Sequence, residues 1–233
     1  MKTIQQTIGD NTYPGRGIIV GRSQDGNYAV TAYFIMGRSE NSRNRVFSQT
    51  PDTLYTEAAD PSKVEDPSLI MYTALRRFDH YLAVTNGDQT DTIYEAIING
   101  GTFESGLETR EFEPDAPNFT PRISAIIDFK DGDFTYKMSI LKSQDENGTA
   151  CSRQFFNYSA LAGEGHFIHT YQTNGNPLPT FSGEPKKVII PNDCDGFAND
   201  IWNSLDKENR IALYVSYTDV KTGRCEHEKI IQG

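Results

Sequence analysis

The sequence lacks any long hydrophobic run. Only 36% of its 233 residues are hydrophobic and its mean hydropathy is −0.57, whereas a membrane-spanning helix needs about 20 consecutive apolar residues. The opening stretch, MKTIQQTIGDNTYPG, likewise holds neither the apolar segment nor the small-residue cleavage site of a secretory signal. We therefore expect a protein that does not bind membranes and that resides in the cytoplasm.

Cysteine and positive charge are also scarce. The three cysteines, Cys151, Cys194 and Cys225, are widely spaced and form no C-x-x-C pair, which argues against a disulfide framework and a zinc site. Lys and Arg number 22 against 32 Asp and Glu, so the net charge is −10. Because nucleic acids bind clustered cations through counterion release, we do not expect a nucleic-acid partner.

Common catalytic and cofactor motifs are missing as well. The chain has no G-x-S-x-G elbow, no P-loop and no G-x-G-x-x-G segment that follows a strand. His166 and His169 are three residues apart on a strand-like pattern, which directs them to opposite faces of a sheet rather than to a shared metal ion. We expect neither a metal site nor a cofactor.

The residues that are present predict a largely β structure. Asp25-Gly26 and Asp131-Gly132 each stand between two stretches of alternating apolar and polar residues, which is the pattern of a β-hairpin. The expected strands cover residues 16–22, 28–36, 68–78, 80–86, 122–143 as a hairpin, 154–158, 165–172, 186–190 and 210–218.

Two helices are predicted among these strands. Over residues 90–101, Thr92 and Glu95 form a capping box and two glycines supply a stop. Over residues 195–205 an apolar face follows Asp193 or Asp195 as N-cap; this face consists of Phe197, Ile201, Trp202 and Leu205. No linker or repeat divides the chain, so we expect one domain, residues 1–233, of the α+β class with helices layered on largely antiparallel sheets.

Residues 16–45 carry a local excess of arginine, with five arginines against two acidic residues. The planar guanidinium group binds phosphate or carboxylate through two parallel hydrogen bonds, so this segment suits a small anionic ligand. A solvated hairpin face with surface salt bridges is the alternative interpretation. The arginines are Arg16, Arg22, Arg38, Arg43 and Arg45.

The loop EPDAPNFTPRIS, residues 113–124, combines three prolines with Glu113, Asp115, Asn118 and Arg122. The prolines would give the following strand a rigid start, or they would hold the four polar side chains in place for a ligand. Polar clusters at other predicted strand ends contain Tyr72, Asn86 and Asp88. Together with the arginines, these clusters describe a pocket with cations, a phenol and carboxylates.

Four segments resemble the archaeal-type IMP cyclohydrolase family: YPGRGIIVGRS, YFIMGRSENSRNRVF, LAVTNGDQTDTI and EPDAPNFTPRIS, in the family's order across residues 13–127. The resemblance implies a four-layered α-β-β-α sandwich like that of N-terminal-nucleophile hydrolases. It also implies the last step of de novo purine synthesis, in which 5-formamido-imidazole-4-carboxamide ribonucleotide closes to IMP. The partner would be this small purine nucleotide, no cofactor would be needed, and the sequence is compatible with a homo-oligomer.

The matching motifs also imply residue roles. Arg38 and Tyr72 would stabilise the formyl group and the carbinolamine, and Glu113 or Asp115 would transfer a proton or orient the amide. Arg16, Arg45 and Arg122 would bind the 5′-phosphate or line its surroundings, and Asn86, Asp88 and Asn118 would contact the base or ribose.

Two alternatives stay open. An amide hydrolase on the same scaffold would need a terminal nucleophile, which the start Met-Lys-Thr does not offer without processing. A non-catalytic protein that binds purine nucleotides would keep the arginines but would need no proton-transfer groups.

Overall fold

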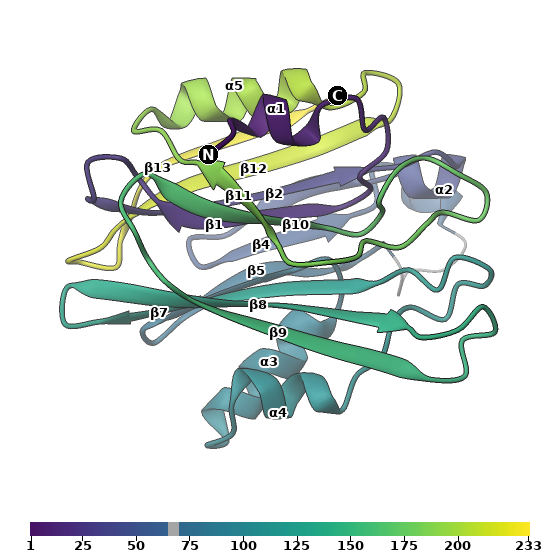
Figure 1. The fold of residues 1–233 in the computed structure, drawn as a ribbon, viewed down its shortest axis with the longest axis horizontal. Coiled ribbons are helices and arrows are strands. Elements are labelled where there is room, and N and C mark those ends of the chain that lie inside the picture. The colour runs from purple at the N-terminus through teal and green to yellow at the C-terminus, as the bar shows by residue number, and fades with distance from the viewer. Residues whose placement is uncertain (65–69) are drawn as a thin grey trace.

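The computed structural model describes residues 1–64 and 70–233, which form two antiparallel β-sheets that face each other (Figure 1). The first sheet has the strand order β11-β10-β1-β2-β12-β13. Its strands are β1 (Gly17–Arg22), β2 (Tyr28–Met36), β10 (Glu164–His169), β11 (Lys186–Ile189), β12 (Arg210–Asp219) and β13 (Cys225–Gln232).

The second sheet has the order β3-β4-β5-β6-β7-β8-β9, so each strand lies beside its neighbour in the sequence. Its strands are β3 (Val46–Gln49), β4 (Thr53–Glu57), β5 (Tyr72–Phe78), β6 (Tyr81–Thr85), β7 (Arg122–Lys130), β8 (Asp133–Ser143) and β9 (Cys151–Ser159).

The main hydrophobic core fills the space between the sheets. Alternation along the strands divides their side chains between two faces: Ile18 and Val20 of β1 enter this core, whereas Ile19 faces the opposite way. Ile123 and Ile127 of β7 enter the same core from the second sheet. This alternation is the one that the two hairpin segments predict.

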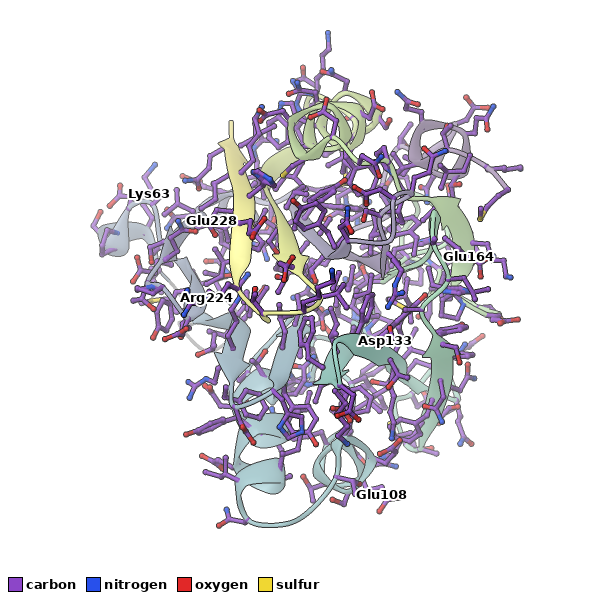
Figure 2. The ribbon with its side chains drawn as sticks, turned by 90° about the vertical axis from the view of Figure 1, so that its left-hand side faces the viewer. Lys63, Glu108, Asp133, Glu164, Arg224 and Glu228 are labelled. Carbon is purple, nitrogen blue, oxygen red and sulfur yellow. The ribbon has the colours of Figure 1, made fainter. Side chains whose placement is uncertain are left out.

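Helices cover the outer face of each sheet (Figure 1). The helices α1 (Ile4–Ile8) and α5 (Cys194–Ser204) lie on the first sheet and bury residues such as Ile8 and Ile201. The helices α3 (Gln89–Ile98) and α4 (Phe103–Glu108) lie on the second and bury Ile93 and Phe103. In Figure 2, Glu108 at the end of α4 lies on the opposite side of the molecule from α5. The short helix α2 (Glu40–Arg43) and a 3-10 turn, Pro61–Lys63, belong to connections.

The structure confirms the mixed α and β class with antiparallel sheets, both hairpins, and Asp193 as the N-cap of α5. The prediction for the start of α3 is wrong. This helix begins at Gln89 with Asp88 at the N-cap, so Thr92 lies inside it, and the Asp88 side chain bonds arginines instead of capping the helix. The strand predicted over 68–78 begins at Tyr72, and residues 68 and 69 lie outside the described part of the chain.

The antiparallel order brings distant segments to one end of the two sheets. In the first sheet, Gly17 at the start of β1 pairs with Phe34 near the end of β2 and with His169 at the end of β10. In the second sheet, Thr85 at the end of β6 pairs with Ser124 near the start of β7. The loops that carry the predicted polar residues leave from these strand ends, and α2 lies among them (Figure 1).

Candidate active site

A cavity of about 260 Å³ opens at this end of the molecule. Its size is near the lower limit of the range typical of small-molecule sites. The structure brings together six residues that the sequence analysis selected, and they line this cavity: Arg16, Arg38, Arg45, Glu113, Asp115 and Asn118. The other selected residues, Tyr72, Asn86, Asp88 and Arg122, do not belong to its lining.

Arg16 and Glu113 form a buried ion pair in the cavity wall. Arg16 Nη1 lies 2.9 Å from Glu113 Oε1, and Arg16 Nη2 donates to Oε2 at 3.0 Å. Burial alone would lower the pKa of Arg16, but the Glu113 carboxylate more than offsets this effect and holds the pKa well above its ordinary value. The charge of Arg16 is therefore already neutralised by Glu113.

Arg38 and Arg45 differ from Arg16, because neither has a carboxylate within ion-pair distance among the residues that the structure describes. Arg45 is buried, and its Nε and Nη2 donate to the carbonyls of Ser42 and Met36 at 2.7 and 2.9 Å. Arg38 is exposed at the cavity and donates to Asn174 Oδ1 at 2.6 Å. A buried cation without a carboxylate partner is costly in a protein interior, and an anionic ligand would lower that cost.

The other two arginines of this segment fit the alternative interpretation, in which arginines make surface contacts and do not bind a ligand. Arg22 pairs with Asp133 at the far hairpin, and Arg43 donates to the carbonyl of Glu208. The local excess of arginine is therefore divided between surface contacts and the cavity.

The loop of residues 113–121 is held by its own hydrogen bonds. Asp115 accepts from the backbone N–H of Thr120 at 2.6 Å and also from the Thr120 hydroxyl. Asn118 Oδ1 accepts from the N–H of Leu178 at 3.1 Å, which ties this loop to the segment after β10. The loop is thus rigid for a reason beyond its prolines, and both carboxylates line the cavity.

Asn86, Asp88 and Arg122 form a layer behind the cavity. Asn86 is fully buried, and its side chain donates to the Pro121 carbonyl at 2.8 Å and accepts from the Ile123 N–H at 2.8 Å. Arg122 Nη1 lies 2.6 Å from Asp88 Oδ1. Burial would raise the pKa of Asp88, but the guanidinium groups beside it lower that pKa overall. These contacts hold the start of β7 against the end of β6.

Tyr72 lies in the core between the sheets, where its hydroxyl is 2.8 Å from the hydroxyl of Tyr33. Its ring is mostly buried, with 7% of its surface exposed.

The sequence analysis missed the segment after β10. Tyr171 lines the cavity, stacks on Tyr13 with ring centroids 5.9 Å apart, and has its hydroxyl 2.6 Å from the hydroxyl of Thr120. Gly15 has a φ of +77°, and a Cβ there would lie 2.2 Å from the Thr170 hydroxyl and 2.5 Å from the Tyr171 ring. A glycine in the YPGRG motif was a signal of this close approach, but the sequence does not say which segment approaches.

Within the described residues, no group of three or more His, Cys, Asp and Glu side chains has the geometry to hold a metal ion. No helix in residues 1–64 and 70–233 is both long and apolar enough to cross a bilayer.

Comparison with known proteins gives the family. Residues 13–223 match the model of a family described as IMP cyclohydrolase-like protein. The chain is 32% identical over 126 residues to an IMP cyclohydrolase of Methanopyrus kandleri, which covers 50% of this chain and 59% of that protein. It is 30% identical over 119 residues to an IMP cyclohydrolase of Methanothrix thermoacetophila, covering 49% and 57%. The matches thus span less than two thirds of either relative, but the family model covers most of this chain, which therefore belongs to the IMP cyclohydrolase-like family.

Proposed function

We propose that this protein is an IMP cyclohydrolase, which closes 5-formamido-imidazole-4-carboxamide ribonucleotide to IMP with loss of water. One observation carries the proposal: a single cavity combines arginines that have no carboxylate partner among the described residues, a buried ion pair and several hydroxyl groups. The substrate has matching parts, namely a 5′-phosphate, a carboxamide and a formyl group. The names of the two relatives support the same activity.

Arg45 is our candidate for binding the 5′-phosphate. Its guanidinium is fixed by two backbone carbonyls in a buried position, so a phosphate meets a cation that needs no reorganisation. Arg16 and Arg122 are not our candidates for this role, because carboxylates neutralise both of them. Arg122, with Asn86 and Asp88, instead supports the loop of residues 113–121 from behind.

The cyclisation first requires that the two reacting groups of the substrate be held in the correct position. The carboxamide nitrogen must attack the formyl carbon of the same molecule, and holding the two groups in contact can supply roughly 7 to 11 kcal/mol. Glu113, which pairs with Arg16, retains lone pairs that can accept from the carboxamide N–H and orient it. Asn118 lines the cavity for contacts to the base or ribose.

The oxygen of the formyl group gains negative charge as the new C–N bond forms. Arg38 and Tyr72 are our candidates for stabilising it, because a guanidinium or a phenol O–H placed at a developing oxyanion lowers the barrier. Arg38 uses one nitrogen to bind Asn174 and the carbonyl of Gly175, which leaves its other N–H groups for the substrate.

We further propose the finer features that the resemblance implies. The order of helices, sheet, sheet and helices is then the four-layered α-β-β-α sandwich of N-terminal-nucleophile hydrolases, formed by one domain of residues 1–233. The protein would act in the cytoplasm, in de novo purine synthesis. Because cyclodehydration involves no redox change, turnover should need no added metal, nicotinamide, flavin or folate, and zinc-dependent activity after chelation would contradict this.

Ultraviolet monitoring tests the proposal directly. Purified protein added to the synthetic formylated ribonucleotide should produce the absorbance of IMP at a rate proportional to protein concentration. Binding without any absorbance change would instead indicate a nucleotide-binding protein without activity.

A further inference from the structure

Three residues of the cavity wall form a continuous chain of hydrogen bonds. The Tyr171 hydroxyl lies 2.6 Å from the Thr120 hydroxyl, and the Thr120 hydroxyl bonds Asp115 Oδ2. The Thr120 N–H donates to the other carboxylate oxygen of Asp115 at 2.6 Å. All three side chains line the cavity, although Tyr171 and Thr120 are separated by 51 positions in the sequence.

The valences of these groups fix the direction of the chain. An ionised carboxylate only accepts, so the single hydrogen of the Thr120 hydroxyl is donated to Asp115. The hydrogen between Tyr171 and Thr120 must therefore come from Tyr171. The Tyr171 oxygen keeps its lone pairs, and these can accept a hydrogen bond from a ligand in the cavity.

We propose that Tyr171, Thr120 and Asp115 form a hydroxyl relay that moves protons between the substrate and the Asp115 carboxylate during ring closure. The inference rests on the proposed cyclohydrolase activity and names its proton acceptor. In this relay Tyr171 is the catalytic residue that touches the carboxamide nitrogen, Thr120 connects it, and Asp115 holds the proton.

The proton transfers balance over the reaction. As the carboxamide nitrogen attacks the formyl carbon, its proton passes to the Tyr171 oxygen, the Tyr171 proton passes to Thr120, and the Thr120 proton passes to Asp115. The C–N bond forms and the formyl oxygen becomes the hydroxyl of the carbinolamine after it takes one proton back. Loss of the proton on the former formamide nitrogen then forms the C=N bond between that nitrogen and the former formyl carbon, and the carbinolamine hydroxyl takes that proton and leaves as water. No oxidant, reductant or external base is consumed.

The other carboxylate of the cavity is less suited to this role. Both oxygens of Glu113 contact Arg16, and transfer of a proton to this carboxylate would leave a buried cation without its partner. Asp115 has no cation within ion-pair distance among the described side chains, and its donors are a backbone N–H and a hydroxyl. The choice between Glu113 and Asp115, which the sequence left open, is thereby made in favour of Asp115.

The relay is also preorganised. Tyr171 has 5% of its surface exposed and Thr120 has 2%. The Tyr171 backbone carbonyl lies 2.8 Å from His169 Nδ1, and its ring is stacked on Tyr13. Burial raises the pKa of Tyr171, so the phenol keeps a proton to pass on when it receives one. Fixed donors and acceptors of this kind need no reorganisation during proton transfer.

Substitutions at Thr120 test the relay, because one variant removes the hydroxyl group and another retains it. Thr120→Val has nearly the same shape but breaks the relay, and we expect kcat to fall about 10²-fold, as for loss of a general acid-base group, with little change in IMP affinity. Thr120→Ser restores the hydroxyl and should keep most of kcat. Tyr171→Phe should lower kcat like Thr120→Val. Tyr217→Phe, which removes a buried hydroxyl bonded to the Pro191 carbonyl, is the matched control.

Each outcome decides the proposal. Wild-type kcat in a folded Thr120→Val protein, or equal losses in the Val and Ser variants, would overturn the relay while leaving the cyclohydrolase intact. If Thr120→Val does not fold, Tyr171→Phe decides alone, and a loss of affinity without a loss of kcat would overturn the relay. A wild-type protein that forms no IMP would refute the proposed function and the relay together.

Discussion

The hydroxyls of Tyr33 and Tyr72 lie 2.8 Å apart across the core, although Tyr33 belongs to β2 of one sheet and Tyr72 to β5 of the other. Burial raises the pKa of Tyr33 well above its ordinary value, although Arg16 and Arg45 act in the opposite direction. The hydrogen shared by the two hydroxyls can come from either tyrosine. When Tyr33 donates it, the hydrogen of Tyr72 is available for a ligand.

Replacing Tyr72 by phenylalanine tests this arrangement. The Tyr72→Phe protein keeps the ring and its packing, and we expect it to fold and to bind IMP while kcat falls by about 10² to 10³, the usual cost of one preorganised oxyanion donor. Single-turnover rates and a thermal melt measure the two properties separately. Wild-type turnover in a normally folded variant would remove Tyr72 from the mechanism.

The second prediction concerns the phosphate. Arg45→Met keeps an apolar stem but removes the charge, and a charge-assisted hydrogen bond contributes about 1.5 to 3 kcal/mol, so the Kd for IMP should rise roughly 10- to 100-fold. Inosine, which lacks the phosphate, should bind both proteins equally. Titration calorimetry measures all four affinities, with Arg43→Met as the control for loss of an exposed arginine. An equal loss for inosine and IMP would show that Arg45 does not recognise the phosphate.

The buried ion pair of the cavity wall should also stabilise the fold. In Glu113→Gln the guanidinium of Arg16 loses its only carboxylate among the described residues, and breaking a buried pair costs about 3 to 5 kcal/mol of unfolding free energy. Glu104→Gln, which breaks the more exposed pair with Lys137, should cost less than about 1 kcal/mol. Urea denaturation gives both values, and equal costs would mean that burial of the Arg16 pair has no energetic consequence.

Stability should fall in acid partly because of His169. Burial lowers its pKa from 6.5 to about 3, so between these two pH values the unfolded chain binds a proton that the folded protein does not. The free energy of unfolding therefore falls as the pH drops through this window, by up to about 1.4 kcal/mol per pH unit from this group. The contribution of His169 to the free energy of unfolding is fully present above pH 6.5.

His169→Asn removes the titration and keeps a side-chain donor. Urea denaturation at several pH values from 7 to 4 should show a shallower loss of stability in this variant than in the wild type. Parallel pH profiles for the two proteins would mean that His169 is not kept neutral by burial.

Much of the fold follows from local patterns in the sequence. Asp25-Gly26 and Asp131-Gly132 fix both long hairpins because the turn chemistry and the alternation act over a few neighbouring residues. The start of α3 was misplaced for the opposite reason: Asp88 bonds Arg110 and Arg122, and these distant contacts are invisible in a local capping pattern. The edge strands β3 and β13 and the short strand β4 were missed, since their pairing with neighbours supplies much of their order.

The candidate site also depends on contacts between distant residues, which local sequence patterns do not reveal. The resemblance selected Arg16, Arg45 and Glu113, which the structure places in the cavity wall. It could not show that Arg16 is neutralised by Glu113, because a pairing over 97 positions leaves no sequence pattern. Tyr171 was missed because its role depends on the end of β10 meeting the loop of residues 113–121, and only the pairing of β1 with β10 brings that end to the cavity.

The fate of the formyl carbon is the most direct test of the proposed activity. The substrate can be labelled with ¹³C in its formyl group and followed by nuclear magnetic resonance in the presence of the purified protein. Cyclisation predicts that the label moves entirely into C2 of the purine ring of IMP, with no free formate. Release of labelled formate would contradict the account in favour of an amide hydrolase, and a substrate signal that stays unchanged while the nucleotide is bound would contradict it in favour of a binding protein.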